Sequence, residues 1–302
     1  MQQFQPGYIE LNKSIELRLR VADLKSMLGS CSLCPRNCGI NRLNNEKGYC
    51  NAGAEVEIAS YFTHFGEEPP LIGKYGSGTI FFTHCHLRCS FCQNADISKY
   101  GKGRSYSTIE LANMMLNLQR QNCHNINLVS PTHYVPQIVD ALSIAVRNGL
   151  DVPLVFNCSG YESLEVLQLL DGVVDIYLPD VKFNTRQGGH VYLNASDYSD
   201  IWKPVIREMH RQVGDLQLND LGVAVKGLMV RHLVMPGDIT ASNEIMKFIA
   251  EEISTNTYIN IMQQYQPYDK ALTDKVINRS IRMDEFQAVV QQARSYGLHR
   301  GF

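Results

Sequence analysis

The sequence predicts an α/β protein: a partial (β/α)6 TIM-like barrel with a small N-terminal segment that carries four cysteines. Short apolar runs of strand length alternate with segments of helical periodicity, which is typical of βαβ units and a parallel sheet. The length of 302 residues accommodates one α/β barrel of about 200–250 residues and a small additional element. We therefore expect a helix and a cysteine segment within residues 1–62 and the barrel within residues 63–302.

The N-terminal part is predicted from local patterns. Residues 12–28 place apolar side chains at helical spacing and predict a helix. The segment from Cys31 to Cys50 follows this helix. Residues 64–78 are rich in glycine and proline, which predicts a loop that leads into the first strand.

The rest of the chain supplies the strands and helices of the barrel. Apolar, β-rich runs predict strands at 79–82, 125–129, 153–157, 173–180, 228–234 and 258–262. The intervening segments predict helices at 107–120, 135–149, about 162–170, 198–213, 240–253 and 284–297. Ser107 and Glu110 have the spacing of a capping box at the start of the first of these helices, and Gly149 is suited to end the second.

The composition is that of an ordinary globular protein, with 44% hydrophobic and 19% charged residues. A formal charge of −2 and a pI near 6.5 give no electrostatic reason to expect nucleic acid or an anionic membrane surface as a partner. The opening stretch MQQFQPGYIE lacks the basic and apolar regions of a secretory signal, and no run approaches the length of a membrane span. We expect a soluble, cytoplasmic protein.

Nine cysteines are many for such a chain, and seven of them fall into two groups. In a reducing compartment, clustered thiols indicate metal or redox chemistry more often than a disulfide framework. The two groups are therefore the first candidates for functional sites.

The second group, Cys85-x3-Cys89-x2-Cys92, directly follows the strand predicted at 79–82. It therefore lies at the carboxyl end of that strand, the face on which α/β barrels carry their active sites. A structural zinc site would need a fourth ligand, His84 or His86, and a residue adjacent to a ligand folds back poorly onto the same metal. Three thiolates suit a [4Fe–4S] cluster with one iron left open.

The spacing C-x3-C-x-aromatic-C, with Phe91 as the aromatic residue, resembles the signature of the radical S-adenosylmethionine superfamily. The stretch GSGTIFFTHCHLRCSFCQN, together with CSLCPRNCGINR, MHRQVG, RHLVMPG and QYQPY, is similar to pyruvate formate-lyase-activating-enzyme-like proteins. The resemblance implies an oxidoreductase that binds S-adenosylmethionine at the open iron and cleaves it reductively to a 5′-deoxyadenosyl radical. A thiolate-held cluster with an open iron should be oxygen-sensitive, so we expect activity only under anaerobic conditions.

The resemblance also carries over to single residues. Asp180 and Lys182 match a D-x-K motif near the cofactor, where the lysine pairs with the methionine carboxylate and the aspartate holds the lysine; the alternative is a solvated ion pair at a strand end. Asn157 and Ser159 are expected to bond the ribose hydroxyls. His232 is either a cofactor contact or a hydrogen-bonded core residue.

One departure from the family pattern follows the second predicted strand. Relatives usually have a G-G-E-P-like motif there, whereas this chain has VSPTHY. Thr132 and His133 stand in that loop and are expected to contact the substrate or the cofactor.

The first cysteine group, Cys31-x2-Cys34-x3-Cys38-x11-Cys50, offers four thiol ligands. One interpretation is an auxiliary iron–sulfur cluster that passes electrons or touches substrate. The other is a zinc or mononuclear iron site that folds a segment too small for a core of its own. Thiolates suit both.

Three functions remain open from the sequence. The first is activation of a glycyl-radical enzyme by abstraction of a glycine hydrogen, with a protein as substrate. The second is radical modification of a small molecule or peptide. The third is a non-catalytic iron–sulfur or zinc protein. For either enzyme, an electron donor such as flavodoxin or ferredoxin is the expected partner.

Overall fold

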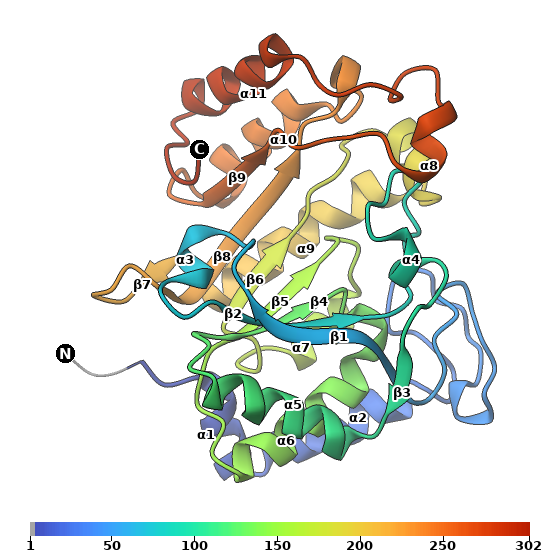
Figure 1. Cartoon of the computed structure of the whole chain (residues 1–302), viewed down its shortest axis with the longest axis vertical. Coiled ribbons are helices and arrows are strands. Elements are labelled where there is room, and N and C mark those ends of the chain that lie inside the picture. Colours follow the sequence, from blue (N-terminus) through green and yellow to red (C-terminus); the bar gives the residue numbers. More distant parts are fainter. Residues whose placement is uncertain (1–3) are drawn as a thin grey trace.

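The computed structural model describes residues 4–302 and shows a mixed α/β fold (Figure 1). The described residues form a nine-stranded sheet with the order β3-β1-β2-β4-β5-β6-β8-β7, and β9 pairs with β8. The strands are β1 (Val56–His64), β2 (Ser77–Phe82), β3 (Arg104–Tyr106), β4 (Ile126–Val129), β5 (Leu154–Cys158), β6 (Ile176–Pro179), β7 (Gln217–Leu218), β8 (Ala224–Leu233) and β9 (Tyr258–Met262). The predicted α/β class is confirmed.

Six of these strands, β2, β4, β5, β6, β8 and β9, run parallel to their neighbours in this order. Every residue of β5 and β6 is buried, as expected for parallel strands that are covered on both faces. The antiparallel strands β1, β3 and β7 lie beside this row. Because the six strands are parallel, the loops that follow them emerge at one edge of the sheet.

The helices cover the sheet from outside (Figure 1). They are α1 (Gly7–Lys13), α2 (Glu16–Ser26), α3 (Pro69–Ile72), α4 (Ala95–Ser98), α5 (Thr108–Arg120), α6 (Val135–Arg147), α7 (Leu164–Leu169), α8 (Arg186–Leu193), α9 (Tyr198–Val213), α10 (Ser242–Phe248) and α11 (Met283–Ser295). Short 3-10 turns lie at Arg42–Asn44, Thr132–Tyr134, Pro236–Asp238 and Asp269–Thr273, and a π turn at Ile249–Ile253. Within residues 4–302, no helix is long and apolar enough to cross a membrane.

Two features that the sequence predicted at helix ends are confirmed in detail. Ser107 and Glu110 form the reciprocal capping box of α5, and Gly149, with φ of 91°, follows the end of α6. The helix predicted at 12–28 is instead two helices, α1 and α2, because the chain turns at Ile15, which has φ of 69°. This turn lets Tyr8 and Leu17 both reach the core.

Strand β1 is the main element that the sequence did not predict. It pairs antiparallel with β2 and β3, so the expected division between residues 62 and 63 falls inside a strand. Residues 1–3 of the expected N-terminal unit lie outside the described residues. The segment with the first four cysteines lies between α2 and β1 and contains one 3-10 turn as its regular structure.

Candidate active site

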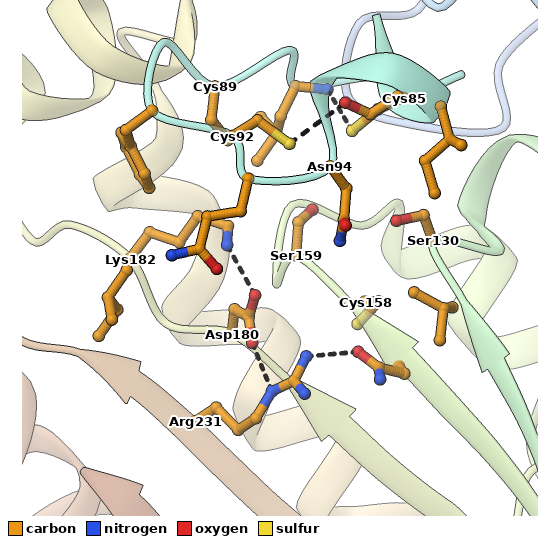
Figure 2. Close-up of a pocket in the computed structure, with 18 of the residues that line it drawn as sticks. Cys85, Cys89, Cys92, Asn94, Ser130, Cys158, Ser159, Asp180, Lys182 and Arg231 are labelled. Atoms are coloured by element: carbon orange, nitrogen blue, oxygen red, sulfur yellow. Dashed lines mark hydrogen bonds and ion pairs between the residues drawn. The ribbon is translucent and has the colours of Figure 1, made fainter. Parts of the chain in front are cut away.

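A cavity of about 290 Å³ lies at the carboxyl ends of the parallel strands (Figure 2). Its lining includes Phe82, Cys85, Leu87, Cys89, Phe91, Cys92, Gln93, Asn94, Ile97, Ser98, Val129, Ser130, Asn157, Cys158, Ser159, Asp180, Lys182, Arg231, Leu233, Met262, Gln264 and Tyr265. These residues come from β2, β4, β5, β6, β8 and β9 and from the loops that follow them. Residues far apart in the sequence therefore meet in one place.

The three cysteines of the loop after β2 form one wall of the cavity (Figure 2). The backbone N–H of Leu87 donates to Cys85 Sγ at 3.4 Å, and Cys92 Sγ lies 3.2 Å from Ser98 Oγ. Two non-glycine residues of this loop, His84 and Arg88, have φ of 65° and 55°. Such left-handed backbone costs energy and persists where the surrounding structure holds it.

Burial raises the pKa of two of these thiols, Cys85 and Cys89. The pKa of Cys89 rises to about 12, because the penalty of burying a thiolate exceeds the opposing effect of Lys182. The pKa of Cys85 is raised by burial as well. A metal or cluster must therefore displace protons from these thiols when it binds.

The three thiols line one cavity but are not placed to bind a single metal ion together. Within residues 4–302, no group of three or more His, Cys, Asp or Glu side chains has the arrangement of a metal-ion site. A [4Fe–4S] cube binds each thiolate through a different iron, so its ligands stay apart from one another. His84 and His86, the fourth ligands of the zinc alternative, do not line the cavity. The donor set fits a cluster with an open iron better than a closed zinc site.

Opposite the cysteines, the floor of the cavity is polar because of strand alternation. Residues two apart on a strand face the same side of a sheet. On β5, β6 and β8, the side that carries buried Val155, Ile176, Leu178 and Met229 continues into Asn157, Asp180 and Arg231. Each strand thus supplies apolar packing first and a polar group where it reaches the cavity.

These polar groups form one network (Figure 2). Asp180 accepts from Lys182 Nζ at 2.7 Å and from Arg231 Nε at 2.7 Å. Arg231 Nη2 also donates to Asn157 Oδ1 at 2.6 Å, and Arg231 Nη1 lies 3.6 Å from Glu67. Arg231 is therefore held by several partners, whereas Asp180 is the one carboxylate that Lys182 contacts in the described residues.

The charges of this network shift the pKa of its members. Burial opposes ionisation of Asp180, but the charges of Arg231 and Lys182 outweigh it and lower the pKa of Asp180 to about 2. The charge of Asp180 keeps the pKa of Lys182 above its usual value despite burial. Because one donor of the ammonium points to Asp180, Lys182 has donors left for an anionic ligand in the cavity.

Between the thiols and this network lie the residues after β5 (Figure 2). Ser159 lines the cavity, and the amide nitrogen of Asn157 makes no hydrogen bond within the described residues. Gly160 has φ of 71°, and a Cβ there would lie 3.1 Å from the Asp180 carbonyl oxygen. Tyr198 Oη lies 2.8 Å from the Ser159 carbonyl and 2.9 Å from that of Asp180, so it joins the two loops.

Three residues predicted to contact the cofactor lie outside this cavity. His232 alternates with Arg231 on β8, points to the other face and is bonded to the Val181 carbonyl and to Ser242. Thr132 and His133 are turned away by the 3-10 turn after β4. In their place Ser130, the first residue after that strand, lines the cavity.

The structure adds Ser130, Asn94 and Arg231 to the candidate site. Arg231 lies within the strand predicted at 228–234, and strand alternation allows either it or His232 to face the cavity. Asn94 follows the three-cysteine loop and Ser130 follows β4, but no sequence pattern identifies either of them as a site residue. Their positions depend on how the two loops turn.

The first four cysteines line a second, smaller pocket together with His133. Cys31, Cys34 and Cys50 are buried, and burial raises the pKa of Cys34 and Cys50. Gly48 lets the chain before Cys50 approach Cys38 closely, since a Cβ there would lie 2.9 Å from Cys38 Sγ. The chain therefore gathers the four thiols into one place.

A buried cation accompanies these thiols. Arg42 lines the same pocket, is fully buried and has no carboxylate partner in residues 4–302. Its guanidinium donates to the carbonyls of Gly53, at 2.6 Å from Nη2, and His133, at 2.6 Å from Nη1. A buried charge without a counter-charge is unfavourable. Its position beside four thiols fits a site that becomes anionic when thiolates bind a metal.

Comparison with known proteins identifies relatives of the chain. A family model described as the radical SAM superfamily matches residues 79–212. The "Uncharacterized protein MJ0674" of Methanocaldococcus jannaschii is 31% identical over 300 residues, which cover 96% of this chain and 82% of that protein. The matched residues contain the three-cysteine loop and the Asp180–Lys182 pair.

Proposed function

Since the chain belongs to the radical SAM superfamily, we propose that Cys85, Cys89 and Cys92 hold a [4Fe–4S] cluster and that the cavity beside them binds S-adenosylmethionine. One observation carries the proposal: three thiols form a wall of a cavity whose lining holds no histidine that would close the cluster's fourth position. The six parallel strands in one row support a partial (β/α)6 barrel as the scaffold.

When bound, the cluster supplies one electron that cleaves the sulfonium to methionine and a 5′-deoxyadenosyl radical, which abstracts hydrogen from a substrate. The residues of the chain bind and orient the cofactor. Lys182, held by Asp180, pairs with the methionine carboxylate. The amide of Asn157 and the hydroxyl of Ser159 bond the ribose. Phe82, Phe91 and Tyr265 limit the access of water.

The four cysteines from Cys31 to Cys50 are proposed to bind a second metal, zinc or iron. Burial of the thiols supports this proposal, and so does Arg42, which has no carboxylate partner within residues 4–302. Four thiolates around a divalent ion carry a net charge of −2, and Arg42 offsets part of it. Because the thiols have to lose protons and move together, the apoprotein and the loaded protein differ at this segment.

The substrate is proposed to be a protein, and activation of a glycyl-radical enzyme is the leading candidate. A cavity of about 290 Å³ is at the small end of the range for ligand pockets. With a cluster and a cofactor in it, little room remains, which favours a substrate presented at the opening, such as a glycine-bearing loop. Direct modification of a small molecule or peptide is the alternative. Flavodoxin or ferredoxin is the proposed electron donor.

The test is anaerobic. The protein is reconstituted with iron and sulfide, reduced with dithionite and given S-adenosylmethionine, and 5′-deoxyadenosine is quantified beside the Cys89→Ala variant. We expect the nucleoside from the native chain and none from the variant. Equal turnover by iron-free protein in air would refute the proposal. If the cluster assembles and reduces but no nucleoside forms, a cofactor titration separates a missing partner from a missing cofactor site.

A further inference from the structure

The two cysteine groups are in contact through the backbone of the cluster loop. Arg36, between Cys34 and Cys38, donates from Nε to the His86 carbonyl at 3.0 Å. Tyr49, next to Cys50, donates from Oη to the Leu87 carbonyl at 3.3 Å. The two carbonyls belong to the residues that directly follow Cys85.

Arg36 also fastens the loop to a third element. Its Nη2 donates to the Leu193 carbonyl at 3.2 Å, and its Nη1 to the Asn194 carbonyl, at the end of α8. The guanidinium lies 4.0 Å from the centre of the Tyr49 ring, so the two side chains also support each other. From α8, the Tyr192 carbonyl accepts from the backbone N–H of Ser90, inside the cluster loop.

A second connection starts from the buried cation. Arg42 donates to the His133 carbonyl at 2.6 Å. The ring of His133 donates from Nε2 to the carbonyl of Thr83 at 2.8 Å, and Thr83 stands two residues before Cys85. The first cysteine segment therefore holds the cluster loop on both sides of Cys85.

The segment is held by a few loop hydrogen bonds, such as that from the Cys31 N–H to the Ile40 carbonyl, and by buried side chains such as Leu33, and it contains no helix or strand longer than one turn. Between Cys31 and Cys50 its regular structure is one 3-10 turn, Arg42–Asn44, and a segment of this size is too small for a core of its own. A metal bound by thiolates is the usual means of fixing such a segment. Arg36 and Tyr49 lie within two residues of a cysteine, so their positions depend on where the thiols are held.

We propose that the segment Cys31–Cys50, fixed by its metal, clamps the loop that carries Cys85, Cys89 and Cys92, with Arg36 and Tyr49 as the positioning residues. This inference rests on the proposed function, in which both groups bind iron or zinc. The clamp keeps the three thiols in place while the cluster's open iron exchanges its ligands. Loss of the second metal then weakens the cluster without touching a cluster ligand.

The test measures how fast the reconstituted cluster loses iron to a chelator under anaerobic conditions, followed by the visible absorbance of the cluster. Metal analysis gives the amount of metal bound at the four cysteines from Cys31 to Cys50. Tyr49→Phe removes one hydrogen bond and is expected to speed iron loss roughly two- to tenfold. Arg36→Gln removes several hydrogen bonds and should speed it more than tenfold. Tyr61→Phe is the matched control, because the Tyr61 hydroxyl makes no hydrogen bond in the described residues.

The metal is tested with Cys34→Ala, which removes a ligand of the second site alone. We expect loss of the second metal and faster iron loss from the cluster, with the same circular dichroism as the native chain. Cluster lifetimes that stay at the native value in Arg36→Gln, Tyr49→Phe and Cys34→Ala would overturn the clamp. A native chain that assembles no cluster would instead overturn the proposed function, so the two failures are distinct.

Discussion

Replacing Lys182 by methionine removes a cation of the cavity floor whose ammonium is bonded to Asp180 alone in the described residues, whereas Arg231 is bonded to both Asp180 and Asn157. The side chain keeps its length and its apolar stem. Asp180 remains paired with Arg231 at 2.7 Å, so no carboxylate is left without a partner. The variant therefore separates cofactor binding from folding.

The size of the effect follows from the interaction that this substitution removes. A hydrogen bond to a charged group contributes about 1.5–3 kcal/mol. At about 1.4 kcal/mol per tenfold change, the dissociation constant of S-adenosylmethionine should rise roughly 10- to 150-fold. Lys182→Arg keeps the charge and should recover part of the affinity.

The assay is an anaerobic titration of the oxidised, cluster-loaded protein with S-adenosylmethionine, in which no turnover occurs. Lys13→Gln is the control, because Lys13 is exposed and pairs with Glu10 on α1. A dissociation constant of Lys182→Met within twofold of the native value would refute the assignment of Lys182 to the cofactor carboxylate.

Two further predictions concern charges away from the cavity. Arg42→Met should weaken binding of the second metal about tenfold, since about 1–2 kcal/mol of charge compensation is removed. Competition with a zinc-sensitive dye measures the metal affinity. An unchanged affinity would contradict the role of Arg42 as counter-cation. Hydrogen bonds from Arg279, together with the backbone N–H groups of Arg282 and Gly237, hold the pKa of Glu285 well below its usual value against the effect of burial. A carboxyl with a lowered pKa stabilises the fold above its unfolded pKa, about 4.5, and loses this contribution as pH falls. In urea unfolding at pH 7, Glu285→Gln should thus be about 1–3 kcal/mol less stable than the native chain. This difference in the free energy of unfolding should become smaller below pH 4. A difference that stays constant with pH would disprove the assignment.

The sequence predicted the parts of the site that depend on strand order. A cysteine group directly after an apolar run, and an Asp-x-Lys motif at the end of another, come together because parallel strands end at one edge of the sheet. Cys85, Cys89, Cys92, Asp180 and Lys182 accordingly line one cavity.

The features that the sequence did not predict depend on which way a strand or turn directs its side chains and on strands outside the parallel row. Alternation separates Arg231 from His232, but it does not tell which of the two faces the cavity. Thr132 and His133 follow a strand end, yet a 3-10 turn rotates them out of the cavity, and His133 lines the pocket of the first cysteine group instead. Strand β1 is half exposed, and its register with β2 shifts between Ile58 and Ser60, so its residues do not alternate cleanly.

A pattern of charge links the two cysteine groups. Each combines buried thiols with a buried cation: Lys182 opposes the rise in the pKa of Cys89, and Arg42 opposes that of Cys50. Neutral thiols gain nothing from a cation nearby, whereas thiolates are stabilised by it. A cation beside each group thus favours the anionic form, which is the form that the proposed metals require. If the first group, Cys31 to Cys50, were only a set of core cysteines, Arg42 would have no counter-charge within residues 4–302, and replacing it by an apolar side chain would leave the metal content of the chain unchanged.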